Sequence, residues 1–124
     1  MKRIINTTQA PKPIGPYSQA IMANDTLYVS GQIPVNPISG KIDSTDIELQ
    51  TKQVMENIKA ILKEAGMNFN NVVKTSIFIM DMANFSKINA VYGSYFTSDF
   101  PARETVQVAK LPLGADVEIS VIAV

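Results

Sequence analysis

Residues 45–66 read TDIELQTKQVMENIKAILKEAG, and this stretch decides the fold. Thr45 and Glu48 have the spacing of a capping box, in which two side chains satisfy free N–H groups at the start of a helix. Gly66 is the residue type that commonly ends a helix in the left-handed region. Between these signals, apolar side chains recur at helical spacing, at Ile47, Val54, Met55, Ile58, Ile61, Leu62 and Ala65. We predict an amphipathic helix whose apolar stripe packs on another apolar layer.

The sequence on both sides of this helix predicts strands. Residues 17–23 and 26–30 are strand-like runs separated by Asn24-Asp25, a pair that suits a tight hairpin turn with positive φ angles. Residues 31–40 contain two prolines and two glycines and predict a loop. Residues 72–80 are rich in β-branched and apolar side chains and are too short for a comparable helix, so they predict a largely buried strand.

A second helix is predicted to begin at Asp81 or Asn84. It should end before Phe100-Pro101, because proline disfavours helical geometry at the residue that precedes it. Its apolar face carries Phe85, Ile88, Val91, Tyr92, Tyr95 and Phe96, with Asn89 at the edge. The last quarter of the chain then predicts a hairpin, in which residues 103–110 and 115–124 are strands joined by a bend.

Alternation along the two last strands assigns their side chains to faces. In the final strand, the expected core face carries Val117, Ile119, Val121 and Ala123, and the opposite face carries Asp116, Glu118, Ser120 and Ile122. In the predicted partner strand, one face carries Arg103, Thr105, Gln107 and Ala109. We predict that a face of mixed polarity bearing Thr105, Gln107, Ser120 and Ile122 packs between the subunits of an oligomer.

Together these elements predict an α+β fold. Two helices should cover one face of a mostly antiparallel mixed sheet, because each helix has to bury its apolar stripe. The length of 124 residues suits a single two-layer domain over residues 1–124, and the sequence contains no internal repeat or linker.

Composition excludes several kinds of chemistry. The chain contains no His, Cys or Trp, so it offers no Ser-His-Asp triad, no thiolate nucleophile, no disulfide and no zinc site of the usual kind. Acidic residues are scattered singly, and we expect neither a metal nor a cofactor. The 11 basic and 11 acidic side chains balance, which gives no reason to expect binding to nucleic acid. No apolar run is long enough to span a membrane and no signal peptide opens the chain, so we expect a soluble, cytoplasmic protein.

Two charged residues are the strongest candidates for a functional site. Arg103 begins a strand directly after Phe100-Pro101, and its planar guanidinium matches a carboxylate with two parallel hydrogen bonds. A structural salt bridge to Asp99 or Glu104 is the alternative for Arg103. Glu118 stands among apolar and small residues, where a carboxylate is either paired with a cation across a subunit interface or has a raised pKa suited to acid and base catalysis.

Other candidates carry weaker signals. Tyr17 lies where a proline-rich loop enters a strand, and Ser30-Gly31 lies at a strand end, where glycine lets the backbone approach a ligand closely. Each of these residues has a purely structural explanation as well. Lys74 could in principle form a Schiff base, but an exposed-edge or interface lysine is the favoured explanation.

Several blocks of sequence together resemble the Rid family, also called YjgF. The blocks are residues 15–20 (GPYSQA), 27–34 (LYVSGQIP), Asn57-Ile58 with Leu62 and Ala65-Gly66, 88–92 (INAVY), 100–103 (FPAR) and 117–119 (VEI). The resemblance is collinear over essentially the whole chain. It implies a homotrimer with a chorismate-mutase-like fold and clefts between subunits. It also implies deamination of 2-aminoacrylate and related enamines and imines that pyridoxal-phosphate enzymes release.

The resemblance also implies roles for single residues. Arg103 is expected to bind the substrate carboxylate and Glu118 to handle the attacking water. The side chains or backbone expected to line the cleft are those of Tyr17, Ser30, Gly31 and Asn89, together with Thr105, which stands where some members carry a cysteine. Glu104 is less usual beside the arginine, and strand parity predicts that it points the opposite way.

Three other functions compete with imine hydrolysis. A non-catalytic regulator would use the same arginine to sense a 2-oxo acid or an amino acid. An RNA-cleaving or translation-inhibiting protein is disfavoured by the zero net charge. A chorismate mutase is disfavoured because chorismate carries two carboxylates. The body of the chain contains one arginine, Arg103, to bind them.

Overall fold

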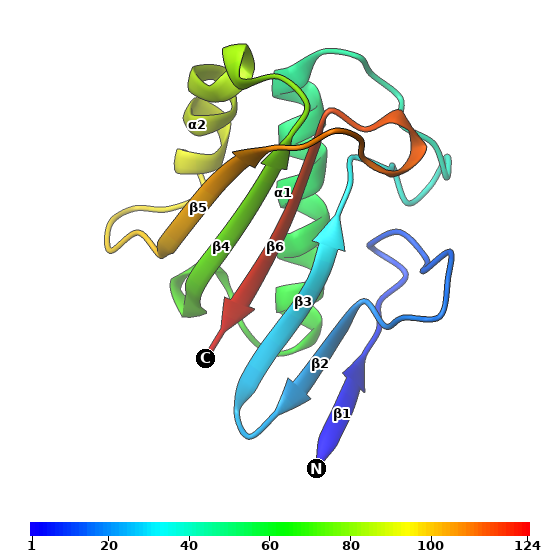
Figure 1. The fold of residues 1–124 in the computed structure, drawn as a ribbon. Coiled ribbons are helices and arrows are strands. Elements are labelled where there is room, and N and C mark those ends of the chain that lie inside the picture. Colours follow the sequence, from blue (N-terminus) through cyan, green and yellow to red (C-terminus); the bar gives the residue numbers. More distant parts are fainter.

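A six-stranded sheet forms one layer of the protein, and the computed structural model describes all of residues 1–124 (Figure 1). The strands are β1 (Lys2–Ile5), β2 (Ala20–Ala23), β3 (Thr26–Gln32), β4 (Val72–Ile79), β5 (Ala102–Gln107) and β6 (Val117–Ala123). Their order across the sheet is β1-β2-β3-β6-β4-β5. Only the β4–β5 pair is parallel, and the other neighbours are antiparallel.

Two helices form the second layer, α1 (Ile47–Glu64) and α2 (Phe85–Gly93). Figure 1 shows both of them behind the sheet, while the front face of the sheet carries no helix. Three short 3-10 turns connect the elements, η1 (Phe69–Asn71), η2 (Met82–Asn84) and η3 (Pro112–Gly114). The predicted α+β fold, with two helices on one face of a mostly antiparallel mixed sheet, is confirmed. No helix combines the length and the hydropathy needed to cross a bilayer.

The long helix α1 forms where it was predicted, but a different residue caps it. Asp46, and not Thr45, is the N-cap, and its carboxylate accepts hydrogen bonds from the backbone N–H groups of Glu48 and Leu49. A carboxylate at this position also favours the positive end of the helix dipole. Gly66 follows the last turn with φ of 76°, as predicted. The buried stripe of α1 faces the sheet and includes Val54, Met55, Ile58, Ile61 and Leu62.

The hairpin of β2 and β3 is confirmed together with its turn. Asn24 and Asp25 have φ angles of 49° and 62°, the left-handed conformation that a two-residue hairpin turn needs. The strand β2 is shorter than predicted, so Tyr17 stays in the loop before it. Conversely, β3 extends through Gly31 to Gln32.

The predicted hairpin at the end of the chain is wrong. β5 pairs with β4 in parallel, and β6 lies between β3 and β4. Burial explains this order: every second residue of β6 from Val117 to Ala123 is fully or almost fully buried, which suits a central strand, whereas no residue of β5 is buried. The chain therefore leaves β4, crosses through α2 and returns as the edge strand β5 (Figure 1).

This pairing also corrects the predicted faces. Thr105 lies opposite Ile77 and Gln107 opposite Ile79, and both isoleucines are core residues under the helices. Thr105 and Gln107 therefore lie on the helix-covered face, whereas Ser120 and Ile122 lie on the open face. The mixed face predicted from the four residues together does not exist. The core face of β6 is confirmed, because Val117, Ile119, Val121 and Ala123 are all buried.

The second helix is shorter than predicted. α2 ends at Gly93, and its last carbonyl groups accept 3-10-type bonds, such as that of Tyr92 from Tyr95 N–H. Beyond that end, Tyr95 and Phe96 still pack on Phe69, with ring centroids 5.3 and 5.4 Å away. Of the predicted apolar face, Ile88, Tyr92 and Phe96 are buried, whereas Phe85 is exposed at the start of α2.

Candidate active site

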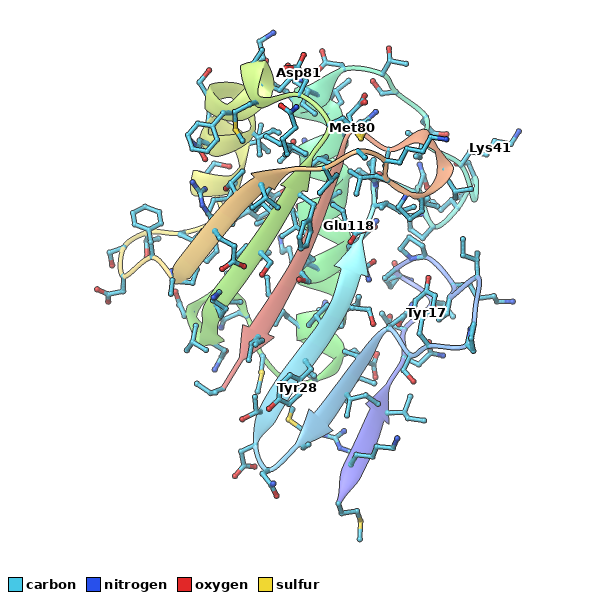
Figure 2. All side chains as sticks on the ribbon, in the orientation of Figure 1. Tyr17, Tyr28, Lys41, Met80, Asp81 and Glu118 are labelled. Carbon is cyan, nitrogen blue, oxygen red and sulfur yellow. The ribbon has the colours of Figure 1, made fainter.

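Glu118 is a half-buried carboxylate without a partner. It projects from β6 onto the open face of the sheet, near the middle of the view in Figure 2. It makes no ion pair and no side-chain hydrogen bond within the chain, and desolvation by burial raises its pKa. Glu118 therefore has no partner within the chain, and the upward direction of its pKa shift is the one that suits a general acid or base.

Gly31 lies directly against this carboxylate. A Cβ atom at position 31 would stand 2.5 Å from Glu118 Oε2, closer than any real Cβ contact. The pairing of β3 with β6 shifts register between Val29 and Gln32, so Gly31 lies in an irregular stretch of β3. A larger residue at position 31 would therefore displace the carboxylate of Glu118 from this place.

Ser30 and Tyr17 lie on the same side of the molecule. Ser30 N–H donates to the Gln19 carbonyl, and Ser30 Oγ donates to the Ser18 carbonyl at 2.6 Å. These bonds tie the end of β3 to the loop that carries Tyr17, whose side chain is 49% exposed. Tyr17 and Ser30 line one shallow depression in the surface. Four predicted residues, Tyr17, Ser30, Gly31 and Glu118, are therefore brought to one region of the open side.

The sequence prediction missed Gln19, which holds this region in place. Its side chain is 2% exposed, accepts a hydrogen bond from Thr7 N–H and donates to the carbonyls of Thr7, Ala10 and Pro11. One amide thus fixes the whole proline-rich loop against β2. The only signal in the sequence was a long polar residue at the junction between a stiff loop and a strand.

Arg103 lies at the other edge of the sheet, on the helix-covered face. Its Nη1 donates to Asn89 Oδ1 of α2 at 2.8 Å. Its guanidinium carbon lies 5.2 Å from the ring centroid of Tyr92 and 5.7 Å from that of Phe85. Two aromatic rings and one amide therefore orient the guanidinium, and no carboxylate of the chain pairs with it. The alternative of a salt bridge to Asp99 or Glu104 is not realised.

Glu104 points away from Arg103, as strand parity predicted. It forms an ion pair with Lys74, whose Nζ lies 2.8 Å from Oε1, and it accepts a hydrogen bond from Ser76 Oγ. These contacts lower the pKa of Glu104. The ammonium group of Lys74 is engaged in this ion pair on the surface, which agrees with a structural role for the lysine.

Thr105 and Asn89 complete the group around Arg103. Asn89 accepts the hydrogen bond that orients the guanidinium, while Asn89 and Arg103 line one shallow depression with Phe100 and Pro101. Thr105 follows Arg103 on the same face of β5, and its Oγ1 is buried without a hydrogen-bond partner. The site residues thus fall into two groups, one around Arg103 and one around Glu118.

Nowhere do three acidic side chains gather closely enough to bind a metal ion.

Comparison with known proteins assigns the chain to a family. Residues 7–124 match the model of the family described as Endoribonuclease L-PSP. A solved structure of a protein of the conserved Rid family from Yersinia pestis superposes with a TM-score of 0.97 at 53% identity, covering 99% of this chain and 98% of that chain. The chain belongs to the Rid family.

Relatives within the Rid family carry different names. The human protein called 2-iminobutanoate/2-iminopropanoate deaminase is 45% identical over 124 residues, which span 100% of this chain and 90% of the human one. A protein of Lactococcus lactis called putative regulator AldR is 51% identical over 121 residues, which span 98% of this chain and 96% of that one. The resemblance seen in the sequence is confirmed.

Proposed function

We propose that this protein is an enzyme that hydrolyses reactive imines of 2-oxo acids, such as 2-iminobutanoate and 2-iminopropanoate, to the 2-oxo acid and ammonia. The observation that carries the proposal is Glu118, a half-buried carboxylate with a raised pKa, no intrachain partner and a glycine against it. A structural carboxylate in such a place is normally paired, whereas a general acid and base has to keep its oxygens free for water. The human deaminase at 45% identity supports the same substrate class.

Arg103 is proposed to bind the substrate carboxylate. Its guanidinium is already oriented by Asn89, Tyr92 and Phe85, and it carries no carboxylate of its own chain. A pre-oriented fork loses little conformational entropy when it forms two parallel bonds to a carboxylate. Thr105, with a buried hydroxyl that lacks a partner, stands beside it and is proposed to complete this half of the site.

The complete site is proposed to form between two subunits of a homotrimer. Within one chain, Arg103 lies on the helix-covered face and Glu118 on the open face, so one small molecule cannot contact both. β5 is an edge strand, and the open face exposes apolar side chains such as Tyr28 (50% exposed) and Val106 (41% exposed). An oligomer in which the Arg103 edge of one subunit meets the open face of the next buries these side chains and unites the two groups.

The chemistry requires only positioning and proton transfer. Glu118 takes a proton from water as the water oxygen bonds to the imine carbon and the electron pair of the C=N double bond moves to nitrogen, and it passes this proton to that nitrogen to give a carbinolamine. Glu118 then takes the proton of the new hydroxyl group and delivers it to nitrogen, so that the carbonyl forms, the C–N bond breaks and ammonia leaves. A carboxylate with a raised pKa can both take up and donate a proton, because its pKa lies nearer to neutral pH than that of an ordinary glutamate. Tyr17, Ser30 and the Gly31 backbone are proposed to line the site.

A binding-only regulator is the second candidate, favoured by the name of the Lactococcus lactis relative. A sensor of 2-oxo acids needs the grip of Arg103 but gains nothing from Glu118, since a carboxylate beside an anionic ligand weakens binding. Cleavage of RNA, which the description of the family model names, has less support because the chain carries zero net charge.

The deciding experiment generates 2-iminobutanoate freshly and follows the release of ammonia with and without the protein. Hydrolysis well above the spontaneous rate is expected. Parallel incubations with RNA, and titration with 2-oxobutanoate, separate the alternatives. Binding of 2-oxobutanoate without any faster imine hydrolysis would contradict the enzyme and leave the regulator, and degradation of RNA would support the third function.

A further inference from the structure

A cavity of about 190 Å³ lies beside the candidate site. Gly31 and Tyr17 line it, and it is enclosed by the loop that contains Pro11 and Ile14, by the start of the next loop at Ile33, and by Leu113 of η3. Because the carboxylate of Glu118 lies against Gly31, the cavity adjoins the group proposed to handle the attacking water. Figure 2 shows Tyr17 on the loop beside β2, on the side of the sheet where Glu118 projects.

The walls of this cavity suit an apolar occupant. Four aliphatic side chains line it, those of Ile14, Ile33, Val35 and Leu113. The amides in the wall are engaged elsewhere: Gln19 bonds to three backbone carbonyls, Gln32 donates to the Ser30 carbonyl, and Asn36 bonds to Asp43 and to Ile38 N–H. The only charged side chain is that of exposed Lys12, at the rim. A methylene chain therefore finds contacts here without displacing a hydrogen bond.

Leu113 supplies an independent observation. Its φ angle is 56°, in the left-handed region that leucine seldom adopts, and its side chain is 62% exposed. A strained backbone conformation persists only where the surrounding structure holds it in place. Such conformations cluster at ligand sites. Placing an aliphatic wall on the cavity is a requirement that accounts for both features.

We propose that this cavity receives the side chain of the substrate and that the enzyme prefers imines with aliphatic side chains longer than the ethyl group of 2-iminobutanoate. The inference rests on the proposed function, because it places the imine carbon of the substrate beside Glu118 and the substrate side chain in the adjoining cavity. An apolar cavity of ~150 Å³ holds a benzene molecule, so a volume of about 190 Å³ leaves room for a side chain of three or four carbons.

The test uses stable 2-oxo acids, so that it does not depend on catalysis. Calorimetric titration of the intact protein with pyruvate, 2-oxobutanoate, 2-oxopentanoate and 2-oxohexanoate should show affinity rising about two- to fourfold for each added methylene group. Ile14→Trp, which fills the cavity from its exposed rim, and Leu113→Ser, which removes one wall, should flatten this rise. The matched control is Leu49→Ser, because Leu49 is 56% exposed on α1 and lies away from the cavity.

Each outcome decides the inference. Affinity that stays constant or falls along the series in the unmodified protein would overturn it, including the case in which a neighbouring subunit fills the cavity. Tighter binding of 2-oxoglutarate than of 2-oxopentanoate, abolished by Lys12→Met, would overturn it in favour of acidic side chains. A rise along the series without hydrolysis of any imine would keep the pocket and reject the deaminase, whereas hydrolysis of 2-iminobutanoate with a flat series would do the reverse.

Discussion

Arg103 and Glu118 lie on opposite faces of the same sheet. Arg103 pairs with Thr75 of β4, and Glu118 pairs with Phe78 of the same strand. Thr75 and Phe78 are an odd number of residues apart, so their side chains point to opposite sides, and the side chains of their partners do the same. A site that needs both groups therefore needs two copies of the chain, and this requirement can be tested separately from the chemistry.

Two inactive variants should restore activity when they are assembled together. Arg103→Ala removes a charged contact to the substrate worth about 1.5–3 kcal/mol, and Glu118→Gln removes the proton acceptor, so each alone should hydrolyse imines poorly. When equal amounts are refolded together, about one quarter of the sites combine an intact Arg103 from one subunit with an intact Glu118 from its neighbour. Imine hydrolysis should return to a corresponding fraction of the activity of the unmodified protein.

The control for this experiment is the same mixture made after each variant has refolded separately. Without exchange of subunits it should stay inactive. A mixture that remains inactive after joint refolding, while forming normal oligomers, would show that the site lies within one subunit or that one of the two residues has another role.

Glu118→Gln should separate catalysis from binding. Glutamine keeps the shape of the side chain but cannot accept a proton from water, so the turnover number should fall by roughly 10²- to 10⁴-fold. Affinity for 2-oxobutanoate should be unchanged or slightly tighter, because a negative charge near an anionic ligand is removed. Steady-state kinetics and calorimetry measure the two quantities. A variant that hydrolyses 2-iminobutanoate at the rate of the unmodified protein would contradict the role given to Glu118.

The parts of the fold that local pattern decides could be predicted from the sequence. The apolar stripe of α1, the Asn24-Asp25 turn and the alternating burial of β6 each depend on residues close together in the chain. The pairing of β5 could not be predicted in this way. Two consecutive strands with a bend between them look like a hairpin, and only burial across the whole sheet shows that β6 belongs in the centre.

At the start of α1, two neighbouring residues, Thr45 and Asp46, are both suited to be the N-cap, and Asp46 takes that position. Asp46→Ala should destabilise the protein by about 1 kcal/mol, because two N–H groups of the first turn lose the carboxylate that accepts from them. Thr45→Ala, at the position expected for the cap, should change the free energy of unfolding by only a few tenths of a kcal/mol. Denaturant unfolding of both variants measures the difference. Equal losses would contradict the assignment of the cap.

The resemblance named Arg103, Asn89, Gly31 and Glu118 as one set and implied clefts between subunits. The sequence did not show that Arg103 and Glu118 lie on opposite faces of one sheet, because that depends on how β5 and β6 pair with β4. The error about Thr105 arose in the same way. Its face depends on pairing with Ile77, a residue 28 positions earlier in the chain.

The raised pKa of Glu118 predicts a pH dependence of stability with a definite sign. Below the ordinary value of 4.5 the carboxyl group is protonated in both the folded and the unfolded chain, so Glu118→Gln and the unmodified protein should be about equally stable. As the pH rises above that value, the unfolded chain loses its proton while burial keeps the folded one protonated. The folded state then binds more protons, and its stability falls until the pH passes the raised pKa. Glu118→Gln lacks this loss, so its melting temperature should exceed that of the unmodified protein increasingly toward neutral pH, measured at one protein concentration.

Glu64→Gln, at the exposed end of α1, controls for the removal of one negative charge. A difference between Glu118→Gln and the unmodified protein that is constant from acid to neutral pH would mean that the carboxylate finds a cationic partner in the assembled protein.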